Sequence, residues 1–262
     1  MLVGTGATKP RPVLADTPDT VPLYDRWTTN SKVFQDPQTG TMTAQMYSGA
    51  VQMPDPSSDT GWTNLDTTLQ PTADGLAPEA AAADVTFSDG TDQSAPLATV
   101  SQDEASVSVV PSGEVPVPTV SGDTATYDQI MPGVDETLQA KAQGFEANFT
   151  VDSPADAPTT LDVPLALDGL SASLGPDGSL VLTDASGTVV GGAEPAQMWG
   201  AAEDPATGEP VAQQPVPSAL VDGPDGPVLV LTPDYTDPAL DYPITIDPAV
   251  NLSLSLDTYV RS

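Results

Sequence analysis

The chain has 262 residues, with 37 Asp and Glu against 6 Lys and Arg, and it contains neither His nor Cys, so its formal net charge is −31. These counts exclude a Ser-His-Asp triad, a thiol nucleophile, a zinc finger and a disulfide framework. The charge repels phosphate backbones, so we expect no nucleic-acid binding. No run of about 18 apolar residues is present, which predicts that no segment spans a membrane.

The first 70 residues indicate a short leader followed by a β-meander. Residues 1–18 are rich in Pro, Gly and Thr without periodicity and predict a flexible leader, which lacks the pattern of a secretory signal. Residues 19–70 predict a meander, because short alternating segments are separated by Pro, Asp and Gly turns. Met42, Ala44 and Met46 fall on one face of such a strand, and we interpret these methionines as core residues.

Residues 71–250 predict an antiparallel β-sandwich-like domain with long Pro/Gly/Asp loops. Apolar residues alternate in successive short runs, most clearly over 144–151 and 161–167, and turn signals recur about every ten residues. The run over 78–83 favours a single helical turn begun by Pro78. Residues 201–227 predict a long exposed loop, and residues 228–231 a strand buried on both faces.

Five groups of segments occur in an order that is similar to a known family. They are residues 26–40, residues 61–69, residues 124–127 with 132–135 and 144–145, residues 177–178 with 198–199, and residues 242–248. Together they resemble the N-terminal β-rich region of secreted, wall-associated actinobacterial proteins that carry DNRLRE-type domains, RHS (YD) repeats or both. Residues 251–262 include a segment, Asp257 to Ser262, that looks like the opening strand of a DNRLRE-type domain.

The resemblance implies a non-catalytic structural or scaffold module of a secreted or cell-wall-associated bacterial protein. Its implied partners are the following domains of the same polypeptide and cell-wall polysaccharide, and it implies no catalytic residues in this region. A glycoside hydrolase that uses two carboxylates is an alternative, because a carboxylate pair is the catalytic apparatus that the composition leaves. With 37 acids, no local context singles out one pair. We therefore expect that the chain is not an enzyme.

Calcium is the metal that the composition favours, because Asp side chains and turn carbonyls supply the oxygen ligands of a hard cation. No segment matches the Asp-x-Asp-x-Asp-Gly calcium loop, and Asp, Gly and Pro also form ordinary turns. The acidity has another explanation, adaptation to a high-salt habitat. The calcium candidates are Asp222, Asp225, Asp234, Asp237 and Asp241.

A carbohydrate-binding module is the other alternative, because exposed aromatic side chains stack on sugars. Trp27, Trp62 and Trp199 are the candidates for such a platform. Each stands beside apolar neighbours in the sequence, so packing in the core is the competing explanation.

Overall fold

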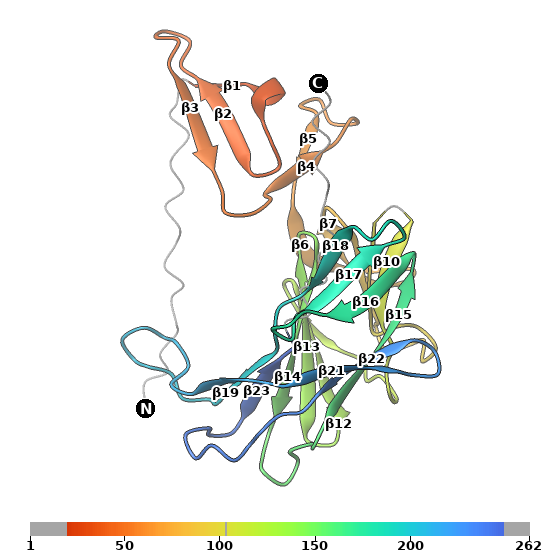
Figure 1. Ribbon diagram of the computed structural model, residues 1–262. Helices are drawn as coiled ribbons and strands as arrows, with labels where there is room; N and C mark the ends of the chain where they lie inside the picture. Colours follow the sequence, from red (N-terminus) through yellow and green to blue (C-terminus); the bar gives the residue numbers. More distant parts are fainter. Residues whose placement is uncertain (1–19, 103, 249–262) are drawn as a thin grey trace. The chain divides into compact units, whose positions relative to one another are not determined.

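The computed structural model describes residues 20–102 and 104–248, which form two compact units that divide after Asn64. A turn of 3-10 helix at Tyr24–Arg26 is the only helical element within these ranges, and no helix there is long or apolar enough to cross a membrane. The other elements are strands in antiparallel sheets (Figure 1). The predicted all-β fold is confirmed. The predicted leader over 1–18 and the DNRLRE-like segment over 251–262 lie outside the described residues.

The smaller unit contains the predicted meander. It consists of a three-stranded sheet in the order β1-β2-β3 and a two-stranded hairpin, β4-β5. Their bounds are Val21–Pro22 (β1), Ser31–Gln35 (β2), Met42–Met46 (β3), Gln52–Pro54 (β4) and Trp62–Asn64 (β5).

This unit is held together by polar and aromatic contacts in place of a buried apolar core. Gln52 is fully buried, and its amide nitrogen donates to the carbonyls of Thr28 and Ser31 at 2.7 and 3.2 Å. The predicted burial of Met42 and Met46 is wrong, because Met46 is 80% exposed and Met42 is 53% exposed. Alternation placed both side chains on one face of β3 correctly, but among the described residues of this unit no layer buries that face.

The larger unit is built on two large antiparallel sheets. The eight-stranded sheet has the order β21-β22-β15-β10-β9-β8-β7-β6, and the seven-stranded sheet has the order β11-β12-β13-β14-β23-β19-β20. The first sheet comprises Asp66–Thr72 (β6), Gly75–Ala80 (β7), Asp84–Phe87 (β8), Ala98–Gln102 (β9), Ala105–Val109 (β10), Leu161–Asp168 (β15), Ser218–Asp222 (β21) and Pro227–Leu231 (β22).

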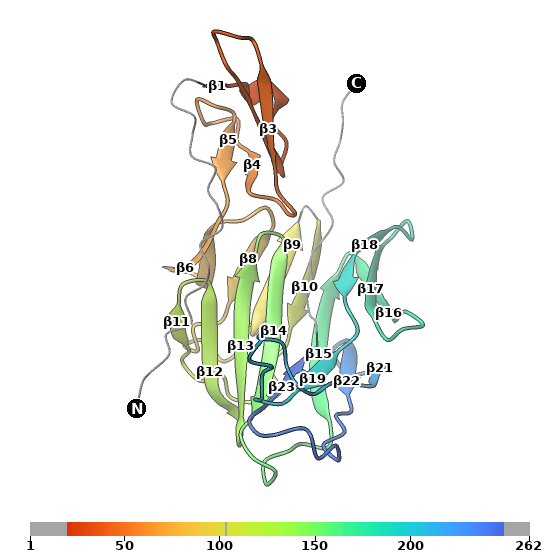
Figure 2. The same cartoon turned by 90° about the vertical axis from the view of Figure 1, so that its left-hand side faces the viewer.

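The second sheet comprises Thr119–Ser121 (β11), Thr124–Met131 (β12), Val134–Lys141 (β13), Gly144–Val151 (β14), Gln197–Trp199 (β19), Gln213–Pro215 (β20) and Ile244–Asp247 (β23). A further sheet of three strands contains Leu170–Leu174 (β16), Leu180–Asp184 (β17) and Val189–Ala193 (β18). Figure 2 shows β12, β13 and β14 lying as a layer across β8, β9 and β10.

One apolar core lies between the two large sheets, because alternate side chains of each strand point inward. In β14, Phe145, Ala147, Phe149 and Val151 are buried, as the sequence predicted. Phe145 meets Phe87 of the opposite sheet edge to face, with ring centroids 5.6 Å apart. The predicted sandwich is therefore observed at its centre.

A buried hydroxyl also joins the two sheets. Tyr127 of β12 is fully buried, and its Oη donates to the carbonyl oxygen of Ser88, just after β8, at 2.6 Å. Ser88 itself is buried, so this carbonyl has little access to water. The hydrogen bond to this buried carbonyl stabilises the fold. Removal of the donor would leave the carbonyl unpaired and destabilise the fold.

Three local predictions are wrong. Residues 78–80 belong to strand β7 and not to a helical turn, because pairing with β6 overrides a weak local helical preference. The segment 201–227 contains β20 and β21 within the predicted loop, and β21 gains its backbone partners from β22. Residues 228–231 lie in β22, where Leu229 and Leu231 are buried while Val228 and Val230 are only half-buried. The boundary between the units is a separate matter: they divide after Asn64, and β6 pairs in the eight-stranded sheet, whereas the sequence analysis grouped residues 65–70 with the meander.

Many of the acidic side chains close turns. In six Asp-x-Ser/Thr segments, the aspartate Oδ1 accepts both the backbone N–H and the hydroxyl of the residue two positions later. This arrangement is a local Asx-type turn. The six aspartates are Asp55, Asp89, Asp92, Asp177, Asp184 and Asp234.

We expect Tyr127→Phe to lower the free energy of unfolding by about 1–3 kcal/mol, because it leaves a buried carbonyl without its donor. Urea unfolding monitored by circular dichroism measures this change. Tyr242→Phe, at a half-buried tyrosine of the same unit, is the control and should have a smaller effect. Equal stability of Tyr127→Phe and the wild type would contradict a stabilising role for the cross-sheet bond.

We expect Asp55→Ala to loosen the β4–β5 hairpin, because Ser57 and Thr63 both donate hydrogen bonds to this carboxylate. These bonds lower the pKa of Asp55 to about 2. The stabilisation is therefore complete above the ordinary pKa near 3.8 and is lost as the pH falls through about 2. Amide hydrogen exchange over 52–64 measures the effect. Asp55→Asn, which keeps an acceptor oxygen, should retain part of the protection.

Candidate functional site

A cavity of about 380 Å³ lies between the two large sheets of the larger unit. The eight-stranded sheet contributes Val109 and Val163, and the seven-stranded sheet contributes Met131 and Phe149. Leu97 and the loop 110–113 complete much of the wall. Most of these side chains are apolar, as is usual for a site that binds a small molecule.

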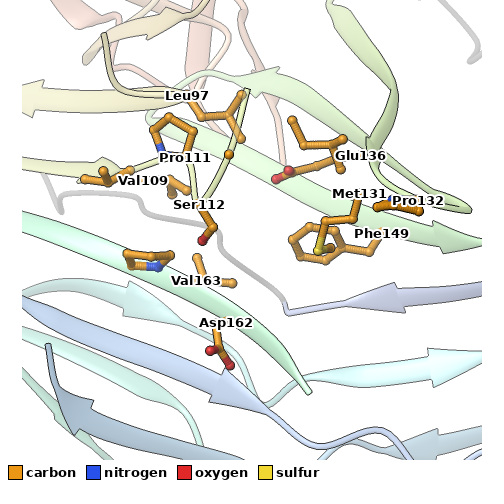
Figure 3. Close-up of a pocket in the computed structure, with 14 residues that line it drawn as sticks. Leu97, Val109, Pro111, Ser112, Met131, Pro132, Glu136, Phe149, Asp162 and Val163 are labelled. Carbon is orange, nitrogen blue, oxygen red and sulfur yellow. The ribbon is translucent and has the colours of Figure 1, made fainter. Parts of the chain in front are cut away.

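Glu136 of β13 is the ionisable side chain that the fold directs into this cavity. Figure 3 shows its carboxyl group in the space between Leu97 and Pro111 on one side and Met131 and Phe149 on the other. The side chain is only 3% exposed, and no hydrogen bond joins its carboxyl group to another described residue. Among the described residues, it is the only acidic side chain that is buried.

Strand alternation explains why this carboxylate lies inside. Val134, Leu138 and Ala140 share the inward face of β13, and Glu136 occupies the position between Val134 and Leu138. The intervening residues, Asp135 and Thr137, are half-buried. Glu136 therefore occupies a position of β13 that the alternation of this strand assigns to an apolar residue.

An irregularity in β12 lies directly beside Glu136. Tyr127 pairs with Glu136 and Met131 pairs with Val134, so three residues of β12 stand opposite Asp135 alone. At the centre of this bulge Gln129 has φ = 55°, a left-handed conformation that is uncommon for a residue with a side chain. The carboxylate of Asp135 accepts the Gln129 N–H at 2.7 Å and supports the bulge from outside.

Burial dominates the electrostatics of the site. Removal from water raises the pKa of Glu136 from 4.5 to about 8, so its carboxyl group is mainly protonated at pH 7. The paired Tyr127 also has a raised pKa, because it is buried and near Glu136. The part of the cavity wall that the structure describes contains no Lys or Arg, so no cation there offsets the charge that Glu136 would carry.

A second acid, Asp162 of β15, also lines the cavity but is oriented differently. It is exposed and stands between the buried Leu161 and Val163, so alternation directs its side chain to the other face of the strand. Figure 3 shows its carboxylate pointing away from Glu136. The two acids do not converge on a common point, as a pair of glycosidase carboxylates must.

The calcium candidates do not come together. Asp234 and Asp237 each accept the backbone N–H of the residue two positions later, and Asp241 accepts the N–H of Ala202 at 3.2 Å. Asp222 and Asp225 lie at the turn between β21 and β22. No cluster of three or more acidic side chains suited to a metal ion occurs within residues 20–102 and 104–248.

The three tryptophans do not form one platform. Trp27 and Trp62 belong to the smaller unit and Trp199 to the larger one, and all three are half-buried. The Trp27 indole donates to the carbonyl of Val33 and the Trp62 indole to that of Tyr24, each at 3.0 Å. Trp27 also packs against Tyr24 and lies under the Lys32 ammonium group, 5.1 Å from its ring centroid.

The sequence analysis did not single out Glu136, although the sequence contains the signal that identifies it. In residues 134–140, a period of two places Glu136 on the same face as Val134, Leu138 and Ala140. A charged residue on the apolar face of a central strand is the exception that marks a site.

Comparisons with known proteins give no further guidance on this cavity, because no family model, curated protein or solved structure matches the chain. The class that the fold defines is an all-β protein with stacked antiparallel sheets.

We expect Glu136→Gln to stabilise the protein at pH 7 by up to roughly 3 kcal/mol, because the raised pKa of Glu136 destabilises the folded state there. In the wild type, the contribution of Glu136 to the free energy of unfolding is most favourable below pH 4.5 and is lost as the pH rises to about 8. The variant should lack this decline. Urea unfolding at several pH values between 5 and 8 measures the difference, and Glu79→Gln, at an exposed position of β7, controls for net charge. Parallel pH profiles of wild type and Glu136→Gln would contradict the buried, unpaired state of Glu136.

Proposed function

We propose that the chain is a non-catalytic structural module of a secreted or cell-wall-associated bacterial protein, preceding DNRLRE- or RHS-type domains of the same polypeptide. The observation that supports this proposal most is the placement of the acids. Six aspartates close their own turns through Asp-x-Ser/Thr hydrogen bonds. These carboxylates stabilise local backbone geometry and do not assemble into a reactive cluster.

The arrangement of the buried acid also supports a non-catalytic role. A glycosidase needs an acid and a second carboxylate on either side of one bond. Glu136 has the raised pKa of a general acid, but Asp162, the other acid at the cavity, points away from it. The order of the sequence segments provides the proposed context, that of a wall-associated protein with further domains.

The structural role is tested with purified full chain and isolated actinobacterial cell walls. We expect no release of reducing sugar from the walls and no co-sedimentation that depends on either tryptophan, because the proposed role is structural and needs no sugar-stacking platform. Trp199→Ala and Trp62→Ala are compared with the wild type. Release of reducing sugar that Glu136→Gln abolishes would support the hydrolase alternative instead. Co-sedimentation that either Trp variant abolishes would support the carbohydrate-binding alternative.

The proposed domain context is tested separately by sequencing the reading frame on both sides of residues 1–262. We expect an upstream secretory signal and downstream DNRLRE or RHS repeats. A frame without such neighbours would contradict the proposed context, while leaving the binding experiments informative.

A further inference from the structure

We propose that the cavity at Glu136 binds a small molecule that has an apolar body and a single ammonium group. The geometry points to this class of ligand, because a buried carboxyl group without a hydrogen-bond partner faces a wall that is otherwise mostly apolar. This inference goes beyond the structural role proposed above, since a structural module does not require an occupied cavity.

The charge expected of the ligand follows from the residues that line the cavity. A buried carboxylate is unfavourable unless a cation or several donors replace its water. No Lys or Arg stands among the described residues that line the cavity, and none of those residues donates a hydrogen bond to the Glu136 carboxyl group. An ammonium group supplies both a positive charge and several donors, and its bonds to a carboxylate are among the stronger hydrogen bonds.

The chemistry of the rest of the ligand follows from the remaining wall. Val109, Val163, Met131 and Phe149 offer apolar contacts, and the volume of about 380 Å³ lies in the range of small-molecule sites. A sugar would place several hydroxyl groups against these side chains without partners, which is unfavourable. A carboxylate ligand would bury its own charge in this wall without a cation to offset it, because no Lys or Arg stands among the described residues that line the cavity. An alkyl or aryl amine can place its ammonium group at the Glu136 carboxyl group and its apolar body against the rest of the wall.

The loop 110–113 brings the cavity next to solvent. Ser112 and Gly113 of this loop are exposed and also line the cavity. The bulge in β12 shapes the other wall, because Ile130, Met131 and Pro132 follow Gln129 directly and also line the cavity. A strained backbone segment next to a buried ionisable group is typical of functional sites.

Binding must release a proton. At pH 7 the free ligand carries an ammonium group, and Glu136 is mainly protonated because burial raises its pKa to about 8. Formation of the ion pair leaves the proton on the ammonium group and transfers the Glu136 proton to buffer. The other titratable groups near Glu136 are Tyr127, whose pKa is raised, and Asp162, which points away from it. Apparent affinity should therefore rise by roughly tenfold per pH unit between pH 5 and 7.

The test is isothermal titration calorimetry of the full chain with three probes that share one alkyl chain. Hexylamine is the cationic probe, 1-hexanol the neutral probe and hexanoate the anionic probe. At pH 7 we expect hexylamine to bind at least roughly tenfold more tightly than 1-hexanol, because charged hydrogen bonds contribute more than neutral ones. Hexanoate should show no binding. Repetition in buffers of different ionisation enthalpy should reveal the released proton.

Two variants locate the site. Glu136→Gln should weaken hexylamine binding by roughly tenfold or more while leaving the affinity for 1-hexanol largely unchanged. Ser112→Phe, at the exposed loop of the cavity, should weaken both, because the larger side chain fills the entrance without disturbing the core. Glu79→Gln, on the exposed part of β7, is the control for net charge and should bind as the wild type does.

Three results would overturn the proposal. They are the absence of hexylamine binding to folded wild-type chain, equal affinity for hexylamine and 1-hexanol, and unchanged hexylamine affinity in Glu136→Gln. Circular dichroism of each variant establishes that it is folded before titration. These outcomes do not depend on sedimentation with cell walls, so failure of the amine proposal and failure of the structural role are distinguishable.

Discussion

Burial of alternate side chains between the two large sheets is the interaction on which the larger unit depends. Each sheet offers one apolar face, and neither face is stable in water alone. Phe87 and Phe145 meet across this interior, and the Tyr127 hydroxyl binds the Ser88 carbonyl from the opposite sheet. The chain has no disulfide and only one ion pair among its described residues, between Lys141 and Glu146 at 2.9 Å. Apolar packing and backbone pairing must therefore provide most of its stability.

The acidic residues experience two opposite environments. Half-buried aspartates such as Asp55 and Asp184 accept hydrogen bonds from turn residues, and this lowers their pKa. Glu136 receives no such bond and is buried, so its pKa rises. The first group stabilises the fold as the pH rises above about 4, and Glu136 destabilises it as the pH rises further. The free energy of unfolding should consequently be greatest in the mildly acidic range.

Much of the fold could be predicted because alternation is a local signal. Residues 144–151 and 161–167 form strands β14 and β15 where apolar periodicity placed them. The errors arose where a partner strand decides the outcome. Residues 78–80 are extended because β6 pairs with them, and Ser218–Asp222 is a strand because β22 pairs with it. Met42 and Met46 have the right periodicity, but burial also needs a covering layer, which the pattern of one strand does not specify.

The candidate site was overlooked for a different reason. Carboxylate pairs and oxygen-rich loops point to exposed residues such as Asp222 and Asp237. The cavity, by contrast, contains one buried acid, which occupies an apolar position of β13. Its wall also includes loop 110–113 and residues of β15, which lie outside the local pattern around Glu136. Alternation within residues 134–140 predicts that Glu136 is inward, but only the packed sheets show that a cavity lies in front of it.

Three departures from local rules occur close together in the larger unit. Glu136 occupies an apolar position, Gln129 adopts φ = 55°, and β12 bulges between the partners of Glu136 and Val134. The alternation of β14 and the Asp-x-Ser/Thr turns, by contrast, follow local rules, as they do in a sequence selected to fold. The buried Glu136 lowers the stability of the larger unit at neutral pH, and binding of a ligand is the best explanation for such a residue at this position. An ammonium group at Glu136 would remove the largest of these conflicts, because it pairs the carboxylate without altering either sheet.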